Sequence, residues 1–469
     1  MTTGAYSLPP RLPIPWPIQY AAAGVWVGAG GDIAALRRLR PLYGGMFRVP
    51  VPALGSKLVA PRHPPFKHLV LVGSPELVKQ VFAADAQTLH FGAPNPLGRV
   101  IGPYSLFSLD EDRHLARRRI VLPPFHGERM HSYESIVEEE TLNEIATWPD
   151  GQEIRTAEPF MRITLNIILR AVFGVREGPL MDELREQVPL AVKLGQRLIG
   201  VAPLQRDLGP RSPGRRFMEW TTRFQWGVNA LIDAARRDPD LKRRTDVLAL
   251  FASATHEDDG SPLSDDEIAD QLKDIVAAGH ETTANTLAWA IERLRRHPDV
   301  WSRLADEAAQ GDGKDLREAT IREVQRTRPV IPGTGRYTVK PFELGGHLLP
   351  PYTVILLVGP LLHHDPNVYP NPGAFDPDRF VGKRPSPNSW IPFGGGLRRC
   401  PGAAFAHMEM DIVLRTLARN VELVPTRRRS ERWLFRGLAF APARGGRAVF
   451  HHRQALRPPA VQVELRAAA

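Results

Sequence analysis

A single uninterrupted helical pattern extends from Ser264 to residue 296 of the 469-residue chain. It opens with S-D-D-E, in which Ser264 and Glu267 can form a capping box, and Pro298 follows its end. Apolar residues recur along it at the spacing of a buried helix: Ile268, Leu272, Ile275, Val276, Leu287, Ile291 and Leu294. At 1.5 Å per residue such a helix is about 48 Å long, enough to cross the whole molecule.

The rest of the chain predicts a mainly α fold with a smaller β region, of the α+β class. Helical patterns dominate residues 110–310, and the clearest of them cover residues 132–148, 161–173, 216–237 and, further on, 403–420. Short apolar runs predict strands at residues 47–51, 68–72, 336–339 and 353–358, with a strand pair near 434–451. No flexible linker separates these parts, so we expect a single domain.

The composition limits the kinds of protein this can be. A single cysteine excludes an intramolecular disulfide and any multi-cysteine zinc or iron–sulfur site. The net charge of +10 suits nucleic acid, anionic lipid or an acidic protein partner equally well. The most apolar N-terminal stretch, residues 18–33, is shorter than the roughly 20 residues that span a bilayer, and no signal peptide precedes it. We therefore expect a cytoplasmic protein without a transmembrane anchor.

The cysteine lies in an unusual loop, F-G-G-G-L-R-R-C-P-G, which runs from Phe393 to Gly402. A buried free cysteine is ordinarily a small hydrophobic residue. Here four glycines let the backbone approach a flat ligand closely, and the amides of a following helix lower the pKa of the thiol and favour an anionic sulfur. The loop resembles the haem-binding loop of the cytochrome P-450 family at every specified position.

The resemblance implies the cytochrome P-450 fold, with haem b between the long central helix and the helix after the cysteine. It implies that Cys400 ligates the iron, that Arg398 pairs with a haem propionate and that Phe393 packs beside the thiolate. Gly394 and Gly402 complete the cofactor-binding loop. Thiolate ligation favours cleavage of the O–O bond, whereas histidine or methionine would point to oxygen storage or electron transfer.

The central helix contains A-A-G-H-E-T-T, residues 277–283, which resembles the family's oxygen-activation segment. The resemblance implies that Glu281 and Thr282 relay protons to dioxygen, and that Ala278 and Gly279 leave room for the gas. Without the cysteine loop, an acid–hydroxyl pair on a solvated helix surface would explain the segment equally well. His280 is expected to have a structural or solvent-facing role.

Two further segments resemble the family's structural network. Glu323 and Arg326 match its E-x-x-R pair, three residues apart on one helix face. Arg379 lies in F-D-P-D-R-F, residues 375–380, and would complete a buried Glu–Arg–Arg network. Asp378 departs from the commoner glutamate there, but Arg379 remains in place. These residues should hold the cysteine loop in shape.

Cationic side chains for the two haem propionates can also be assigned by resemblance. His114 and Arg118 lie four residues apart on one helix face, and Arg336 matches a later arginine of the family. Carboxylates brought into a protein interior need several cationic partners. For Arg117 and Arg119 we expect a solvated basic face, with docking of an acidic redox partner as the functional alternative.

The expected function is monooxygenation: one oxygen atom of O2 enters a small apolar substrate and the other becomes water. No flavin-binding or ferredoxin-like cysteine pattern is present, so we expect electrons from a separate ferredoxin and an NAD(P)H-dependent reductase. A peroxygenase or isomerase is the first alternative, disfavoured by the Glu281–Thr282 pair. A non-catalytic haem sensor or a nucleic-acid binder is the second, supported only by the positive charge.

The resemblance covers residues 45–450, which defines a haem domain between a proline-rich leader, residues 1–44, and a tail, residues 451–469. We expect a monomer. The substrate pocket is expected to be mainly apolar, which allows fatty acids, terpenoids, sterols or polyketides alike. Its walls are expected at residues 88–109, 194–204 (in a mobile lid), 277–278, 330–331 and 438–440.

Overall fold

The structure is a computed structural model that describes residues 6–11, 45–50, 66, 68–92, 96–174, 177–199, 202–311 and 313–453. Its α-helices are α4 (Pro75–Ala83), α5 (Pro96–Ile101), α6 (Glu111–Val121), α7 (His131–Ile145), α8 (Ala157–Phe173), α9 (Pro179–Ile199), α10 (Pro213–Arg237), α11 (Val247–Ala252), α12 (Asp265–Leu294), α13 (Pro298–Ala309), α14 (Asp315–Thr327), α15 (Gly359–His363) and α16 (Ala403–Asn420). Its strands are β1 (Met46–Pro50), β2 (His68–Val72), β3 (Leu89–His90), β4 (Glu153–Arg155), β5 (Gly333–Thr338), β6 (Phe342–Leu344), β7 (His347–Leu349), β8 (Thr353–Val358), β9 (Val421–Leu423), β10 (Trp433–Phe435), β11 (Phe440–Pro442) and β12 (Arg447–His452). The predicted mainly α class with a smaller β region is confirmed.

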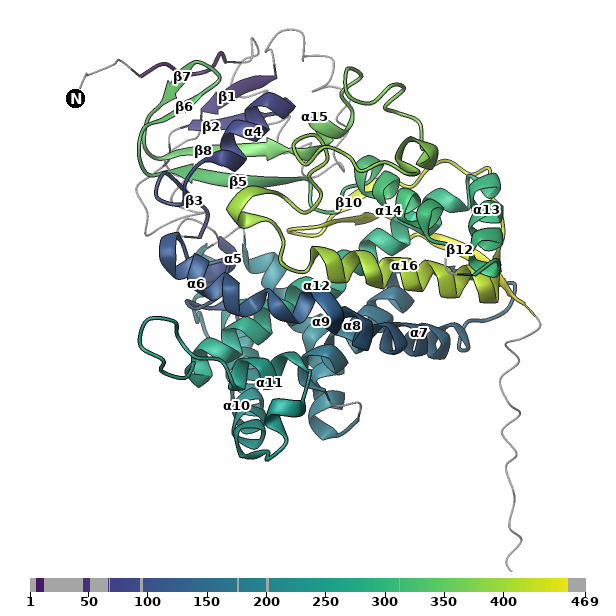
Figure 1. The fold of residues 1–469 in the computed structure, drawn as a ribbon, viewed down its shortest axis with the longest axis horizontal. Coiled ribbons are helices and arrows are strands. Elements are labelled where there is room, and N and C mark those ends of the chain that lie inside the picture. The colour runs from purple at the N-terminus through teal and green to yellow at the C-terminus, as the bar shows by residue number, and fades with distance from the viewer. Residues whose placement is uncertain are drawn as a thin grey trace, which may run out of the picture.

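The central helix is present as predicted. Ser264 caps α12: its side chain accepts a hydrogen bond from the Glu267 amide, while the Glu267 carboxylate accepts one from the Ser264 amide. The helix has 30 residues, which makes it about 45 Å long. Most of its side chains are buried, because α8, α14 and α16 all pack against it (Figure 1).

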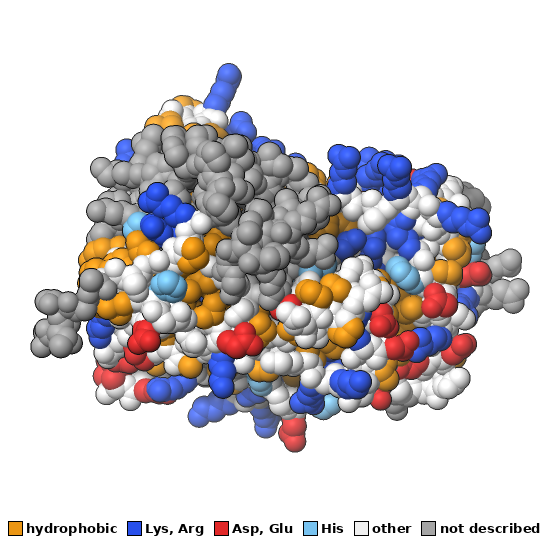
Figure 2. Space-filling view, turned by 90° about the horizontal axis from the view of Figure 1, so that it is seen from above, with side chains coloured by type: hydrophobic (Ala, Val, Ile, Leu, Met, Phe, Trp, Pro, Cys, Tyr) orange, Lys and Arg blue, Asp and Glu red, His pale blue; other side chains and the backbone are white. Residues whose placement is uncertain are grey.

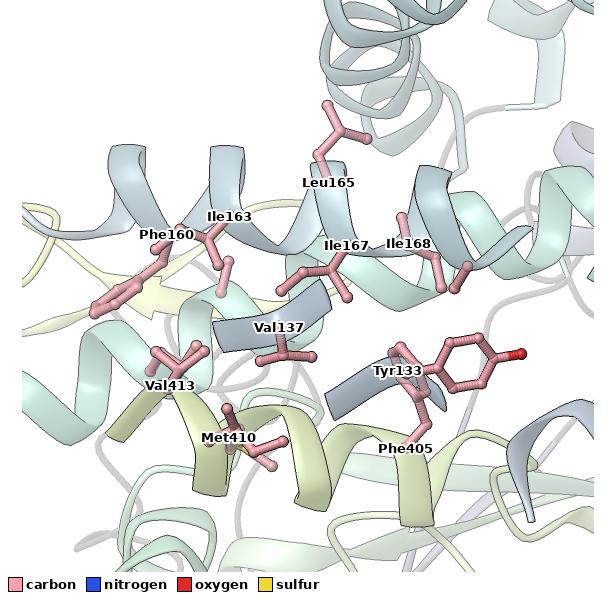
Figure 3. Close-up of a cluster of buried hydrophobic side chains, with 14 of the residues drawn as sticks. Tyr133, Val137, Phe160, Ile163, Leu165, Ile167, Ile168, Phe405, Met410 and Val413 are labelled. Atoms are coloured by element: carbon pink, nitrogen blue, oxygen red, sulfur yellow. The ribbon is translucent and has the colours of Figure 1, made fainter. Parts of the chain in front are cut away.

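The largest core cluster joins α7, α8 and α16 to the central helix. In Figure 3, Ile163 and Ile167 of α8 point towards Val137 of α7 and the apolar face of α16. The rings of Tyr133 and Phe405 meet edge to face with their centroids 5.4 Å apart. Close packing of this kind fixes the position of α16, and the residues immediately before α16 carry the cysteine.

A five-stranded sheet in the order β1-β2-β8-β5-β3 forms the β region at the upper left of Figure 1. Strands β2 and β8 pair in parallel, with His68 opposite Thr353, and the other neighbours are antiparallel. Strands β2 and β8 have the predicted bounds, because their β-branched and leucine runs favour a buried strand. Strand β5 starts three residues earlier than predicted and ends beside the cysteine loop.

The strand pair predicted near residues 434–451 was wrong in its pairing. Strands β10 and β11 form a short hairpin with each other, whereas β12 pairs with β4 and β9, which come from distant parts of the chain. The pairing of β12 with such distant strands cannot be predicted from the local sequence. Strand β12 ends at His452, just beyond the predicted domain boundary at residue 450.

Residues 6–11, the described part of the predicted leader before residue 45, pack on the sheet. Arg11 bridges to Arg48 of β1, and the Arg48 side chain donates to the Pro9 carbonyl at 2.9 Å. Residues 12–44 of the leader and 454–469 of the tail lie outside the described residues. Within the described part of the chain, none of the helices has the length and apolarity that a bilayer crossing requires.

Two carboxylates on the central helix hold the loop between α5 and α6. Asp270 accepts a hydrogen bond from the Tyr104 amide at 3.0 Å and pairs with Lys273 at 2.7 Å. Asp274 accepts from the Ser105 hydroxyl at 2.7 Å and the Leu106 amide at 2.9 Å. Burial, with a contribution from the Asp270 charge, raises the pKa of Asp274 to about 7. The loop is one of the predicted pocket walls, so these bonds set its position.

Replacing Asp274 with asparagine is expected to flatten the pH dependence of stability between about pH 4 and pH 7. The folded chain holds a proton on Asp274 that the unfolded chain releases, because its pKa is raised from 3.8 to about 7 on folding. The stabilisation by this proton is complete below about pH 4 and is lost as the pH rises towards 7. Asparagine keeps a donor and an acceptor but does not titrate. Thermal unfolding midpoints measured across this pH range test the prediction.

The matched control is Asp233→Asn on the exposed side of α10, which should leave the pH dependence as in the parent protein. An Asp274 variant with the parent slope would contradict the assignment.

Candidate active site

The loop before α16 turns sharply to present the cysteine. Gly394 and Gly396 have φ angles of +63° and +61°, a region that favours glycine. A Cβ on Gly396 would lie 2.5 Å from the Phe82 carbonyl oxygen, so the loop also needs glycine to pack on α4. The Cys400 amide donates to the Phe393 carbonyl at 3.0 Å, which closes the turn.

The Cys400 thiol lies deep in the fold and is nevertheless accessible to solvent. Many protein atoms surround Cys400, but open space lies directly in front of it. Burial raises the pKa of Cys400, while the Gly402 amide and the Arg118 and Arg399 guanidiniums lower it. The expected lowering of the thiol pKa is therefore wrong for the polypeptide alone, because burial outweighs the helix amides.

The middle of the central helix has an accessible stripe among otherwise buried residues. Ala278 is exposed, and Glu281 and Thr282, three and four residues later on the same face, are half-buried. The Thr282 hydroxyl donates to the Ala278 carbonyl at 2.9 Å. Gly279 is partly accessible as well. A Cβ there would come 3.0 Å from the Ile168 side chain, so its small size also serves packing against α8.

The Glu281 carboxylate interacts with two other parts of the chain and with its own helix. It accepts a hydrogen bond from the Gln196 amide of α9, and the Arg436 charge and Asn285 of α12 stabilise its ionised form. Burial is the larger effect and raises the pKa of Glu281 above its ordinary value. A raised pKa makes the carboxyl a better proton acceptor than an ordinary glutamate.

His280 has a structural role, which was one of the two alternatives expected for it. Its side chain is buried, and its Nδ1 lies 2.8 Å from the Val276 carbonyl oxygen. Burial lowers the pKa of His280 and so favours the neutral ring, which then donates this bond.

Four basic side chains gather at the cysteine loop: His114 and Arg118 of α6, Arg336 of β5 and Arg398 of the loop itself. His114 and Arg336 are buried, and burial together with neighbouring arginines lowers the pKa of His114 to about 3. Burial and the adjacent positive charge likewise lower the pKa values of Arg336 and Arg398 to about 10. Arg118 forms no ion pair with the described residues. The cluster therefore carries more positive charge than the protein around it compensates.

Asp110 is the acidic residue within this cluster, and it is a functional candidate that sequence analysis missed. It pairs with Arg398 and accepts from the Phe91 and Gly92 amides at 2.8 and 2.9 Å. Arg398 also donates to the carbonyls of Leu106 and Leu109, at 3.1 and 2.6 Å. Asp110 directly precedes α6, four residues before His114, and this position in the sequence was the signal that could have identified it.

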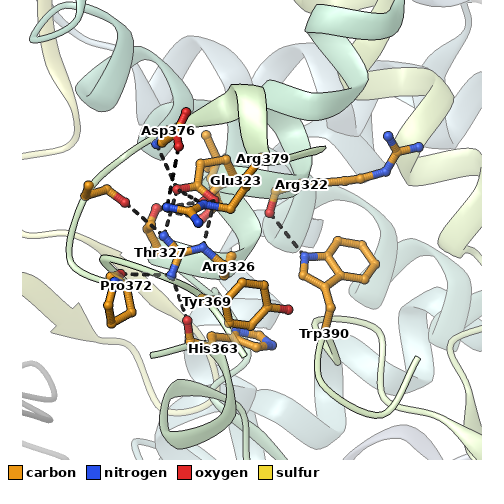
Figure 4. Close-up of polar contacts among 12 residues, drawn as sticks. Arg322, Glu323, Arg326, Thr327, His363, Tyr369, Pro372, Asp376, Arg379 and Trp390 are labelled. Carbon is orange, nitrogen blue, oxygen red and sulfur yellow. Dashed lines mark hydrogen bonds and ion pairs between the residues drawn. The ribbon is translucent and has the colours of Figure 1, made fainter. Parts of the chain in front are cut away.

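The predicted Glu–Arg–Arg residues lie together under the loop (Figure 4). Glu323 and Arg326 form two hydrogen bonds of 2.7 Å, and both side chains are fully buried. Arg326 also donates to the carbonyls of His363, Pro372 and Ala374. Arg379 approaches Glu323 at 3.3 Å. Asp378, in contrast, points outward and pairs with exposed Arg303 at 2.6 Å.

The prediction of a solvated basic face was wrong for Arg117. Its side chain is buried and pairs with Glu267 at the start of the central helix, which is 150 positions away in the sequence. A partner at that distance cannot be read from local pattern. Arg119 is exposed, as expected, and pairs with exposed Glu257.

The predicted pocket walls are only partly described, and the described residues differ in accessibility. Residues 93–95 and 200–201 lie outside the described residues. Of the others, Ala278 lies on the accessible stripe, while Val330 and Phe440 are buried and joined by a backbone hydrogen bond of 2.8 Å.

Comparison with known proteins places this arrangement in a family. The family model for cytochrome P450 matches residues 62–444. The chain belongs to the cytochrome P450 family. It is therefore a cytochrome P450 monooxygenase, and its cofactor is haem b.

Relatives and solved structures agree with this assignment. The cytochrome P450 138 protein of Mycobacterium tuberculosis is 48% identical over 390 residues, which cover 83% of this chain and 87% of that protein. Cytochrome P450 137 of the same organism is 34% identical over 94% of this chain and 91% of its own length. The retinoic-acid-bound cyanobacterial CYP120A1 has a TM-score of 0.78 at 20% identity, and the alignment covers 96% of this chain and 100% of that chain. At that identity the likeness shows the fold alone.

The site residues of this P450 fit haem b on structural grounds. Two propionates would compensate the positive charge of Arg118, Arg336 and Arg398, and the neutral His114 ring could donate a hydrogen bond to one of them. The accessible thiol of Cys400 supplies a sulfur ligand, and a metal ion at the sulfur displaces the thiol proton despite burial.

Replacing Arg326 with alanine is expected to cost about 3–5 kcal/mol of unfolding free energy, because it leaves the Glu323 charge buried without a partner. Arg303→Ala is the matched control, because it breaks an exposed arginine–aspartate pair and should cost less than about 1 kcal/mol. Urea unfolding of the holoproteins measures both. Equal losses in the two variants would contradict a supporting role for the buried pair.

Proposed function

We propose that this P450 inserts one oxygen atom of O2 into a small apolar organic molecule, by hydroxylation or epoxidation, at a haem held by Cys400. The observation that carries the proposal is the accessible cysteine beside a cluster of three arginines, of which Arg118 and Arg336 have no ion-pair partner among the described residues. A lipid, terpenoid, sterol or polyketide-like molecule is the proposed substrate class. The domain that performs the reaction is proposed to span residues 45–450.

Each site residue has a proposed task. Cys400 ligates the iron, Phe393 packs beside the sulfur, and Gly394 and Gly402 shape the loop. His114, Arg118, Arg336 and Arg398 hold the propionates. When bound, the haem supplies the redox chemistry that activates dioxygen.

The central helix is proposed to deliver protons. Thr282 donates to the carbonyl of Ala278, so its hydroxyl oxygen is free to accept a proton from another donor. The raised pKa of Glu281 makes this carboxyl a better proton acceptor than an ordinary glutamate, and we propose that it passes protons along the stripe. Gln196 orients the carboxyl, and the buried surroundings keep bulk water away from it.

Electrons are proposed to come from a small acidic ferredoxin and its NAD(P)H-dependent reductase. The net charge of +10 supports an acidic partner, and Lys and Arg side chains gather at one end of the face in Figure 2. We propose that the protein acts as a monomer in the cytoplasm.

The proposal predicts turnover of an apolar ligand, first selected by its shift of the Soret band, when the holoprotein receives a ferredoxin–reductase pair. Thr282→Ala should lower product formation by roughly 100-fold or more, because the proton relay loses its hydroxyl. The Soret shift on ligand binding should remain. Product formed per reductant consumed separates loss of proton delivery from loss of electron supply.

Thr222→Ala on α10 is the matched control, because this exposed threonine makes the same bond to the carbonyl four residues earlier. Vigorous peroxide-driven turnover with no turnover from reductase pairs would contradict the proposal and favour the peroxygenase alternative.

A further inference from the structure

A cavity lies away from the cysteine loop, where the start of α8 meets β4, β12 and the turn of the β10–β11 hairpin. It is lined by Arg155, Ala157, Glu158, Met161, Arg436, Ala443, Arg444, Gly445 and Arg447. Its volume is about 220 Å³, which corresponds to about seven water molecules at roughly 30 Å³ each. Pockets for whole drug-sized ligands begin at about 300 Å³, so this cavity suits a small molecule or a headgroup.

The cavity has four guanidinium groups and one carboxylate in its wall. Arg155, Arg436 and Arg444 form no ion pair with the described residues. Arg447 pairs with Glu153 at 3.1 Å, but Arg428 shares that carboxylate at 3.0 Å. The positive charge around the cavity therefore exceeds the negative charge.

Further features of the wall favour an anion. Arg447 lines the cavity, and its buried Nε has no hydrogen-bond partner among the described residues. The cavity also adjoins the N-terminus of α8, a helix of 17 residues whose dipole favours negative charge at this end. Glu158, the acidic residue of the wall, also interacts with Arg162 and so compensates only part of the charge.

We propose that this cavity is a binding site for a small organic anion with a carboxylate or phosphate group. Guanidinium groups bind both groups through paired N–H donors with matching geometry, and several of them around one cavity fix the orientation of the ligand. Glu158 restricts the site to ligands that place their negative charge on the arginine side of the cavity.

The site lies one hairpin turn from the proton relay. Gly437 follows Arg436 and packs directly on α9, where a Cβ would come 2.6 Å from the Gln196 carbonyl oxygen. The Gln196 side chain in turn donates to Glu281. A ligand on Arg436 therefore sits next to the group that orients the relay carboxyl, which gives the site a direct physical connection to turnover.

Isothermal titration calorimetry of the holoprotein with inorganic phosphate, and separately with succinate, at constant ionic strength tests the proposal. We expect saturable binding at one site for at least one of the two anions, and the anion that binds identifies the preferred group. The double variant Arg155→Ala, Arg444→Ala should weaken this binding at least tenfold. Neither side chain has an ion-pair partner in the described residues, so the fold should persist, and an unchanged thermal midpoint checks this.

Arg243→Ala is the control, because this exposed arginine lies on the short 3-10 helix at Leu241–Arg243, and its loss should leave the affinity unchanged. Absence of saturable binding for both anions would overturn the proposal, as would equal affinity in the double variant and the parent protein. Because heat of binding does not depend on turnover, this result is distinguishable from a failure of the proposed monooxygenase function.

Discussion

We propose that the buried ion pair between Glu323 and Arg326 is the constraint on which the position of Cys400 depends. The chain between α15 and α16 has little regular structure, so hydrogen bonds within helices and strands do not hold it. Arg326 donates to three carbonyls of this segment and its start, those of His363, Pro372 and Ala374. Just before the cysteine loop, the Ile391 amide donates to the His363 ring at 3.0 Å. Burying two charges is costly, and full hydrogen bonding of the kind seen here is what offsets that cost.

The site combines two surfaces of opposite character. On one side, Arg118, Arg336 and Arg398 concentrate positive charge that fits two carboxylates, and His114 adds a neutral hydrogen-bond donor. On the other, the accessible stripe of α12 presents small and polar side chains in an otherwise buried helix. Arg398 and Asp274 connect the two sides, because both bind the chain that links α5 to α6. Arg398 donates to the carbonyls of Leu106 and Leu109, and Asp274 accepts from Ser105 and Leu106. Hydrogen bonds thus connect the cysteine loop, the cluster of basic side chains and the central helix.

The sequence predicted the features that depend on local pattern. The caps of α12, the bounds of β2 and β8 and the start of α16 follow from capping residues, periodicity and β-branched runs. The cysteine loop could be recognised because several glycines, an arginine and a thiol must occur at fixed spacing. The contact between Gly279 and Ile168 of α8 joins residues far apart in the sequence, so it could not be predicted from local pattern. The partners of Arg117 and β12, and the roles of Gln196 and Arg436, depend on contacts across the fold and could not be predicted.

The central claim is that the Cys400 sulfur is the ligand of the haem iron. The most direct measurement is the absorption spectrum of the reduced holoprotein under carbon monoxide, compared between the parent and Cys400→Ala, with haem content measured separately. The account predicts a red-shifted Soret peak in the parent protein and its loss in the variant. Retention of that peak after the substitution, or its absence from the haem-loaded parent protein, would contradict the account.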